Sequence, residues 1–117
     1  MAGMWKNTDV FNQSSLILDT SNVVNMNEVF SGAYIFNGVL FGWDTSKVEG
    51  MSSMFYGAMA FNQNISGWDT SKVIYMDNMF NYANAFNSDI SGWNTSAVIT
   101  MNRMFFQNAQ FSQNISG

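Results

Sequence analysis

The chain contains no cysteine, no histidine and no proline among its 117 residues. Without cysteine it can form neither a disulfide nor a thiolate metal site. Without histidine it lacks the commonest general base and the commonest metal ligand. We therefore expect no enzyme activity and no cofactor.

Charge is also scarce, because only 10% of the residues are charged, against roughly 25% in typical soluble domains. The net charge is −4, and only four residues are cationic. Nucleic acids and anionic membrane surfaces both attract clusters of Lys and Arg, so neither is an expected partner. No apolar run is long enough for a membrane span, and the first residues do not resemble a signal peptide, so any targeting signal is expected outside this segment.

What the sequence does contain is a repeat with a period of 25 residues. Two adjacent segments both read W-D-T-S-K-V-x-x-M-x-x-M-F-x-x-A-x-A-F-N-x-x-I-S-G, and the segments on either side keep much of this pattern. We number the copies from first to fifth along the chain, the first being partial and the second divergent: 1–17, 18–42, 43–67, 68–92 and 93–117. A fixed period of this length indicates a single solenoid domain, which we interpret as part of a longer array.

Each copy carries one set of apolar residues at the same positions. One copy cannot bury these side chains alone, but stacked copies can, so we predict that they form columns in a shared core. In the third copy the set is Trp43, Val48, Met51, Met54, Phe55, Ala58, Phe61 and Ile65.

Local spacing predicts an α/β solenoid in which equivalent short strands stack in parallel. The β-branched residues around Val48 and its equivalents favour one short strand, and the loose alternation over 61–68 indicates a second. The apolar residues of 51–58 have the spacing of a short helical turn. The alternative is one continuous helix over 46–58, with Ser46 as its N-cap.

In this arrangement the chain resembles the BspA-like leucine-rich-repeat proteins of bacterial surfaces, most closely their mycoplasma-type repeat. The motif that carries the resemblance is W-D-T-S-x-V-x-x-M-x-x-M-F, and it covers almost the entire chain. The resemblance implies a leucine-rich-repeat-like solenoid outside a bacterial cell or on its surface. It also implies adhesion or host interaction, and no enzyme activity.

Two columns of polar residues are interpreted as structural. We expect the threonines to satisfy turn amides in every copy, while a surface that binds ice stays a remote alternative. We expect the asparagines to form a ladder to backbone groups of adjacent copies. The threonine column is Thr20, Thr45, Thr70 and Thr95, and the asparagine column is Asn12, Asn37, Asn62 and Asn87.

Three aspartates, Asp19, Asp44 and Asp69, also align, and Lys47 and Lys72 follow the last two of them by three residues. Calcium prefers oxygen ligands, so these carboxylates are weak candidates for a calcium site. Each copy contributes few further carboxylates, so we predict no metal.

The positions that vary between copies are where specificity is expected. Tyrosine among Asn and Ser is typical of adaptable contact surfaces and also suits stacking against sugars. The alternative is that these rings only cover the rims of neighbouring copies. The candidate exposed aromatic residues are Tyr34, Tyr56, Tyr75, Tyr82 and Phe106.

Two functions follow as hypotheses. The first is a non-catalytic module that binds a host protein or a glycan. The second is a structural stalk or filament in which uncapped ends of the solenoid associate with one another, because open ends expose apolar surface and strand edges.

Overall fold

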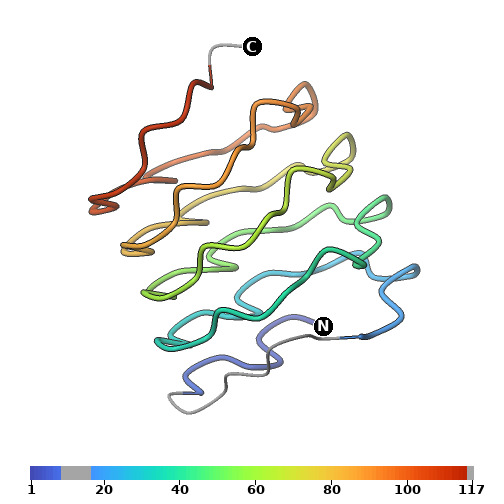
Figure 1. Ribbon diagram of the computed structural model, residues 1–117. Coiled ribbons are helices and arrows are strands. Elements are labelled where there is room, and N and C mark those ends of the chain that lie inside the picture. Colours follow the sequence, from blue (N-terminus) through green and yellow to red (C-terminus); the bar gives the residue numbers. More distant parts are fainter. Residues whose placement is uncertain (9–16, 116–117) are drawn as a thin grey trace.

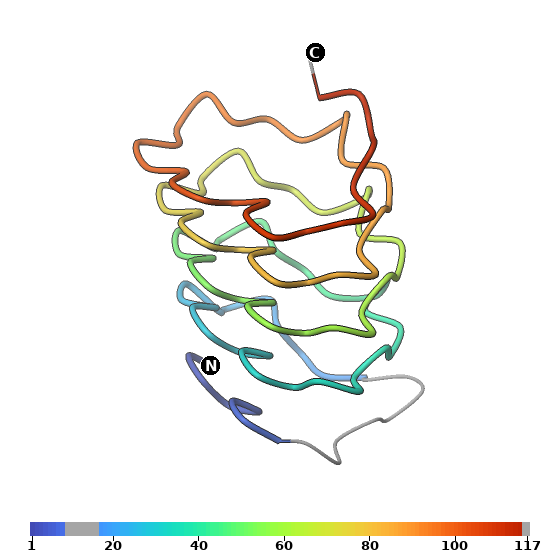
Figure 2. The same cartoon turned by 90° about the vertical axis from the view of Figure 1, so that its left-hand side faces the viewer.

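The computed structural model describes residues 1–8 and 17–115 (Figure 1). Each 25-residue copy makes one coil of chain, and successive coils lie one above another from the N-terminal to the C-terminal end (Figures 1 and 2). The stack measures 35 × 33 × 20 Å along its principal axes. The repeat therefore sets the architecture: the second, third and fourth copies each lie between their two sequence neighbours.

Regular secondary structure is almost absent from these coils. The described residues form no helix and no extended strand, and hence no helix that could cross a membrane. The predicted strand near Val48 is reduced to one bridging residue in each of the second to fifth copies. Parallel bridges join Asn25 to Gly50, Gly50 to Tyr75, and Tyr75 to Thr100.

The predicted helical turn over 51–58 is wrong, and so is the alternative helix over 46–58. Met54 N–H donates within the copy to the carbonyl of Met51 at 3.3 Å, whereas Phe55 N–H donates to Met79 of the next copy at 2.9 Å. Backbone donors thus alternate between local turns and the next coil. Ser53 has a φ of 55° and Gly57 a φ of 67°, and these left-handed conformations are incompatible with a continuous helix.

The second predicted strand, over 61–68, is also wrong. Asn62 N–H donates to the side-chain Oδ1 of Asn37 at 2.9 Å, and Asn87 N–H donates to Oδ1 of Asn62 at 2.8 Å. An amide side chain therefore takes the place that a backbone carbonyl would hold in a parallel ladder. The coils still stack in register, but without a backbone sheet along this side.

The predicted core is confirmed. All eight apolar residues predicted for the third copy are buried, and so are their equivalents in the fourth. Eight of the phenylalanines form two continuous stacks, in which ring centroids of adjacent copies lie 5.5–5.7 Å and 5.9–6.0 Å apart. The two stacks are Phe30, Phe55, Phe80 and Phe105, and Phe36, Phe61, Phe86 and Phe111.

The irregular segment 51–58 and its equivalents place side chains on two sides. Met51, Met54, Phe55 and Ala58 turn inward and are buried. The residues between them turn outward, and these are positions at which the copies differ most. The core positions are mostly repeated from copy to copy, whereas the outer surface varies, and the candidate site lies on this variable surface.

Candidate binding site

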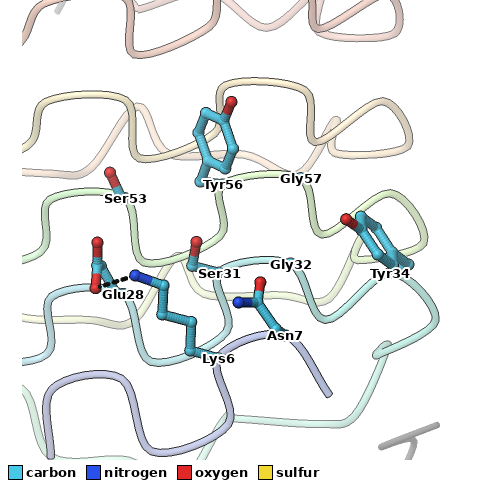
Figure 3. A pocket seen from close by; sticks show the side chains of 9 residues that line it. All are labelled: Lys6, Asn7, Glu28, Ser31, Gly32, Tyr34, Ser53, Tyr56 and Gly57. Carbon is cyan, nitrogen blue, oxygen red and sulfur yellow. Dashed lines mark hydrogen bonds and ion pairs between the residues drawn. The ribbon is translucent and has the colours of Figure 1, made fainter. Parts of the chain in front are cut away.

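A depression on this variable surface spans the first three copies (Figure 3). Its volume is about 320 Å³, at the lower end of the roughly 300–1,000 Å³ typical of small-molecule pockets. Its lining is mainly hydrogen-bonding side chains, two tyrosines and two glycines. The lining residues are Lys6, Asn7, Glu28, Ser31, Gly32, Tyr34, Ser53, Tyr56 and Gly57.

Two glycines at equivalent positions contribute no side chain to the lining, which leaves room for the depression. Gly32 has a φ of 70° and Gly57 a φ of 67°, a region that glycine adopts without steric cost. A Cβ on Gly32 would lie 2.3 Å from Oδ1 of Asn7, so the Asn7 side chain could not keep its place there. Glycine at position 32 therefore leaves room for the Asn7 side chain in the lining, whereas a Cβ at position 57 would make only an ordinary contact with Tyr34.

Two tyrosine rings flank the depression. Tyr34 is 45% exposed and Tyr56 is 38% exposed, so part of each residue packs against the protein and part is accessible to a ligand. A Cβ on Gly57 would lie 3.8 Å from Cε1 of Tyr34, which places this ring from the second copy against the third. In Figure 3 Tyr34 lies on one side of the depression and Tyr56 above it.

The side opposite Tyr34 is polar. Lys6 Nζ donates a hydrogen bond to Glu28 Oε2 at 2.8 Å, and this ion pair joins the first and second copies. Both side chains are partly exposed, so the pair adds little stability, typically less than about 1 kcal/mol. In Figure 3 the Ser31 hydroxyl lies between the ion pair and the tyrosines, and Ser53 lies above Glu28.

Two further aromatic side chains follow Tyr56 toward the C-terminal end of the stack. The Tyr82 ring lies 5.9 Å from the Tyr56 ring with an interplanar angle of 78°, and the Phe106 ring lies 6.2 Å from Tyr82 at 89°. The guanidinium of Arg103 lies 5.8 Å from the centre of the Phe106 ring. We call Tyr56, Tyr82 and Phe106 the aromatic stripe.

Tyr75 is the one aromatic candidate of the five that belongs to neither the depression nor the stripe. It is 46% exposed and lies at the row of parallel bridges, between Gly50 and Thr100. The structure thus brings Tyr34 and Tyr56 together, links Tyr56 to Tyr82 and Phe106, and leaves Tyr75 apart.

The threonine hydroxyls act between copies and not within their own turns. Thr20 Oγ1 donates to the carbonyl of Asp44 at 3.0 Å, and Thr45 Oγ1 donates to that of Asp69 at the same distance. Thr70 makes the equivalent bond to Asn94. The first three threonines of the column are buried, so they present no hydroxyl row to an ice surface, whereas Thr95 is exposed.

The asparagine column makes a second side-chain ladder. Asn37, Asn62 and Asn87 each accept the backbone N–H of the equivalent residue in the following copy. Asn12 lies outside the described residues. The ladder runs along an accessible side of the stack, since Asn37 and Asn62 are exposed.

The aspartate column stabilises turns. Oδ1 of Asp19 accepts the hydroxyl of Ser21 at 2.6 Å and its N–H at 3.0 Å, and both bonds lower the pKa of this carboxyl group. The equivalent serines lower the pKa of Asp44 and Asp69 in the same way. Within residues 1–8 and 17–115, no three His, Cys, Asp or Glu side chains gather as a metal site would require.

Sequence reasoning found the two tyrosines but missed the rest of the depression. Glycine at both Gly32 and Gly57, one period apart, was the available signal, because it marks a position with special backbone requirements. Lys6 and Glu28 lie 22 residues apart and occupy different positions of the repeat, so the period alone did not connect them.

No curated protein and no solved structure matches this chain. One family model does match, and it covers residues 1–117, the whole chain. The chain therefore belongs to the family described as mycoplasma protein of unknown function, DUF285.

Proposed function

We propose that the chain is a non-catalytic binding module that recognises a glycan through the depression between Tyr34 and Tyr56. The observation that carries this proposal is the placement of two half-exposed tyrosine rings around a small cavity lined by hydroxyl, amide, carboxylate and ammonium groups. This is the combination that a sugar requires, because a sugar ring has apolar C–H faces and a rim of hydroxyl groups.

The chemistry of the lining favours a saccharide over a protein partner. Protein interfaces centre on apolar or aromatic anchors that are fully desolvated. The lining of the depression contains no aliphatic side chain, and Glu28, Lys6, Ser53 and Asn7 offer both donors and acceptors. A hydroxyl-rich ligand can satisfy these groups, whereas an apolar side chain from a protein would leave them without partners.

We further propose that the stacked copies are a solenoid of the leucine-rich-repeat type, displayed at the surface of a bacterial cell. The 25-residue period, the parallel bridges at equivalent positions and the asparagine ladder support the solenoid. The resemblance of the repeat to BspA-like surface proteins supports the location.

The experiment is a screen of the purified protein on an array of defined oligosaccharides, followed by isothermal titration calorimetry with the saccharides that bind. Tyr34→Asn and Tyr56→Ser replace each ring with the residue that another copy carries at the equivalent position, so the fold should persist. We expect each variant to weaken binding by about tenfold or more, which corresponds to about 1.4 kcal/mol.

The matched control is Tyr75→Thr, which removes an equally exposed ring outside the depression and introduces the residue found at Thr100. It should bind like the unmodified protein. The proposal is refuted if no saccharide binds, or if the variants at Tyr34 and Tyr56 bind as tightly as the control.

A further inference from the structure

We infer that the site takes a linear oligosaccharide that runs along the axis of the stack, from the depression over Tyr82 to Phe106. This inference rests on the proposed function and specifies its ligand as a chain rather than a single sugar. It would make Tyr82 and Phe106 contact residues for units of the glycan that lie beyond the depression.

The aromatic stripe is continuous with the depression and crosses the third, fourth and fifth copies. Tyr56 belongs to both, and each step to the next ring is about one coil of the stack, at 5.9 and 6.2 Å. Tyr56, Tyr82 and Phe106 are 38%, 39% and 47% exposed. A ligand that left the depression past Tyr56 would therefore meet a further exposed ring at each successive coil.

The rings of the stripe are oriented differently from the rings of the core. Phe55 and Phe80 lie parallel within 3°, so they cover one another's faces. In the stripe, adjacent rings are nearly perpendicular, at 78° and 89°. An edge-to-face contact covers at most one face in each pair of rings, so the stripe keeps ring faces that its aromatic neighbours do not cover, although the Arg103 guanidinium lies over one face of Phe106.

The position of Tyr82 is the sharpest indication that the stripe has a function. Its φ is 59°, in the left-handed region, where the equivalent residues are Gly32 and Gly57 in the two preceding copies, and Asn7 and Gln107 in the first and fifth copies, so Tyr82 is the one aromatic residue of this column. A bulky side chain is an outlier there. Tyr56 and Phe106 lie one position earlier in the repeat than Tyr82, and no residue at that earlier position has a positive φ. In the fourth copy Asn81 occupies the earlier position, and the aromatic ring is carried by the next residue, Tyr82.

Asn81 adds a second local cost. It is buried, and its Oδ1 has no hydrogen-bond partner among the described residues. The fourth copy thus combines a tyrosine in the left-handed region with an unsatisfied amide oxygen, whereas the third copy has Gly57 and Tyr56 at these positions and the fifth has Gln107 and Phe106. Strain of this kind is concentrated at functional sites. What the fourth copy gains from these local costs is the Tyr82 ring, placed edge-on between the rings of Tyr56 and Phe106.

The test uses the same array, with size series from the monosaccharide to the hexasaccharide of chito-, cello-, malto- and manno-oligosaccharides and of N-acetyllactosamine repeats. The variants are Tyr82→Gly and Phe106→Asn, alone and combined, which introduce the residues of Gly57 and Asn81 at their equivalent positions. Tyr82→Gly also removes the backbone strain, so loss of the fold does not complicate it. Tyr75→Thr is again the control.

For the unmodified protein we expect affinity to rise with chain length beyond the disaccharide. In the combined variant this gain should disappear, a loss of about three- to tenfold for each ring, while binding of the shortest ligand stays unchanged. A length-dependent gain that persists in the combined variant overturns the inference. So does an unmodified protein that binds short and long chains equally, and in both cases the proposed function stands. If no saccharide of any length binds, the proposed function and the inference fail together.

Discussion

Glycine should be more stabilising than alanine at position 82 and less stabilising than alanine at position 56. The two tyrosines are a matched pair, since they are 39% and 38% exposed and contact each other edge to face. They differ in backbone conformation: Tyr82 has a φ of 59°, whereas Tyr56 has no positive φ. Replacement of each ring by Ala and by Gly therefore separates the effect of the backbone from the loss of the ring.

The magnitudes follow from two opposing effects. Glycine loses more conformational freedom on folding than alanine does, which lowers stability by roughly 0.5–1 kcal/mol wherever the backbone is ordinary. The left-handed conformation costs an L-residue with a Cβ roughly 1–2 kcal/mol. At position 56 only the first effect operates, so Ala is favoured. At position 82 the second exceeds the first, so Gly is favoured by about 0.5–1 kcal/mol.

The assay is urea unfolding of the four single variants, followed by tryptophan fluorescence, because Trp43, Trp68 and Trp93 are buried in the native state. At each position we take the free energy of unfolding of the Gly variant minus that of the Ala variant. This difference should be about 1–2 kcal/mol more positive at position 82 than at position 56. This comparison cancels the lost ring contacts and the freedom of glycine in the unfolded chain. If Ala is as stable as Gly at position 82, the left-handed strain is absent and the reasoning about Tyr82 fails.

Three further changes test the core, the ladder and the turns. Phe55→Ala removes a fully buried ring from the aromatic stack and should lower the free energy of unfolding by about 3–5 kcal/mol, measured by urea denaturation, whereas a loss below about 1 kcal/mol would contradict the packed core. Asn62→Ala removes the acceptor for the N–H of Asn87 and should cost about 0.5–1.5 kcal/mol, while Asn62→Asp keeps the acceptor and should cost less in the same assay. Serine bonds lower the pKa of three turn aspartates, so their contribution to stability is present above the unfolded pKa near 3.8 and is lost as pH falls through the lower folded values. Replacement of all three by Asn should flatten the fall in melting temperature over this acidic range without removing the turns, and an unchanged profile would contradict the assignment. The three aspartates are Asp19, Asp44 and Asp69.

The asparagine and threonine columns show where sequence reasoning succeeded and where it stopped. Residues one period apart had to be neighbours, so a ladder to the adjacent copy was predictable for Asn62, and the structure has one. The partner of the threonines was not predictable. Thr45 donates to a carbonyl in the next copy instead of accepting an amide N–H of its own turn, because the offset of the coils brings Asp69 within reach.

The depression shows a different limit. Tyr34 and Tyr56 were identified because they vary between copies, but their neighbourhood was not. The period predicts contacts between equivalent residues, whereas Lys6 and Glu28 pair across non-equivalent positions. Contacts between non-equivalent positions depend on how far side chains reach between coils. The spacing of residues along the sequence does not give this distance.

The sequence by itself determined the repeat, the order of the coils and the composition of the core. A period without insertions can bury its apolar positions only by stacking copies in register, so Phe55 had to lie between its equivalents in the neighbouring copies. Only the tertiary structure decided the backbone within each coil. The apolar spacing of 51–58 is compatible with a helix, but the neighbouring coil supplies carbonyl partners for alternate N–H groups, and left-handed residues at Ser53 and Gly57 direct these groups toward it. Hydrogen bonding between copies therefore overrode the local preference, because the stack satisfies backbone donors that an isolated copy would have satisfied as a helix.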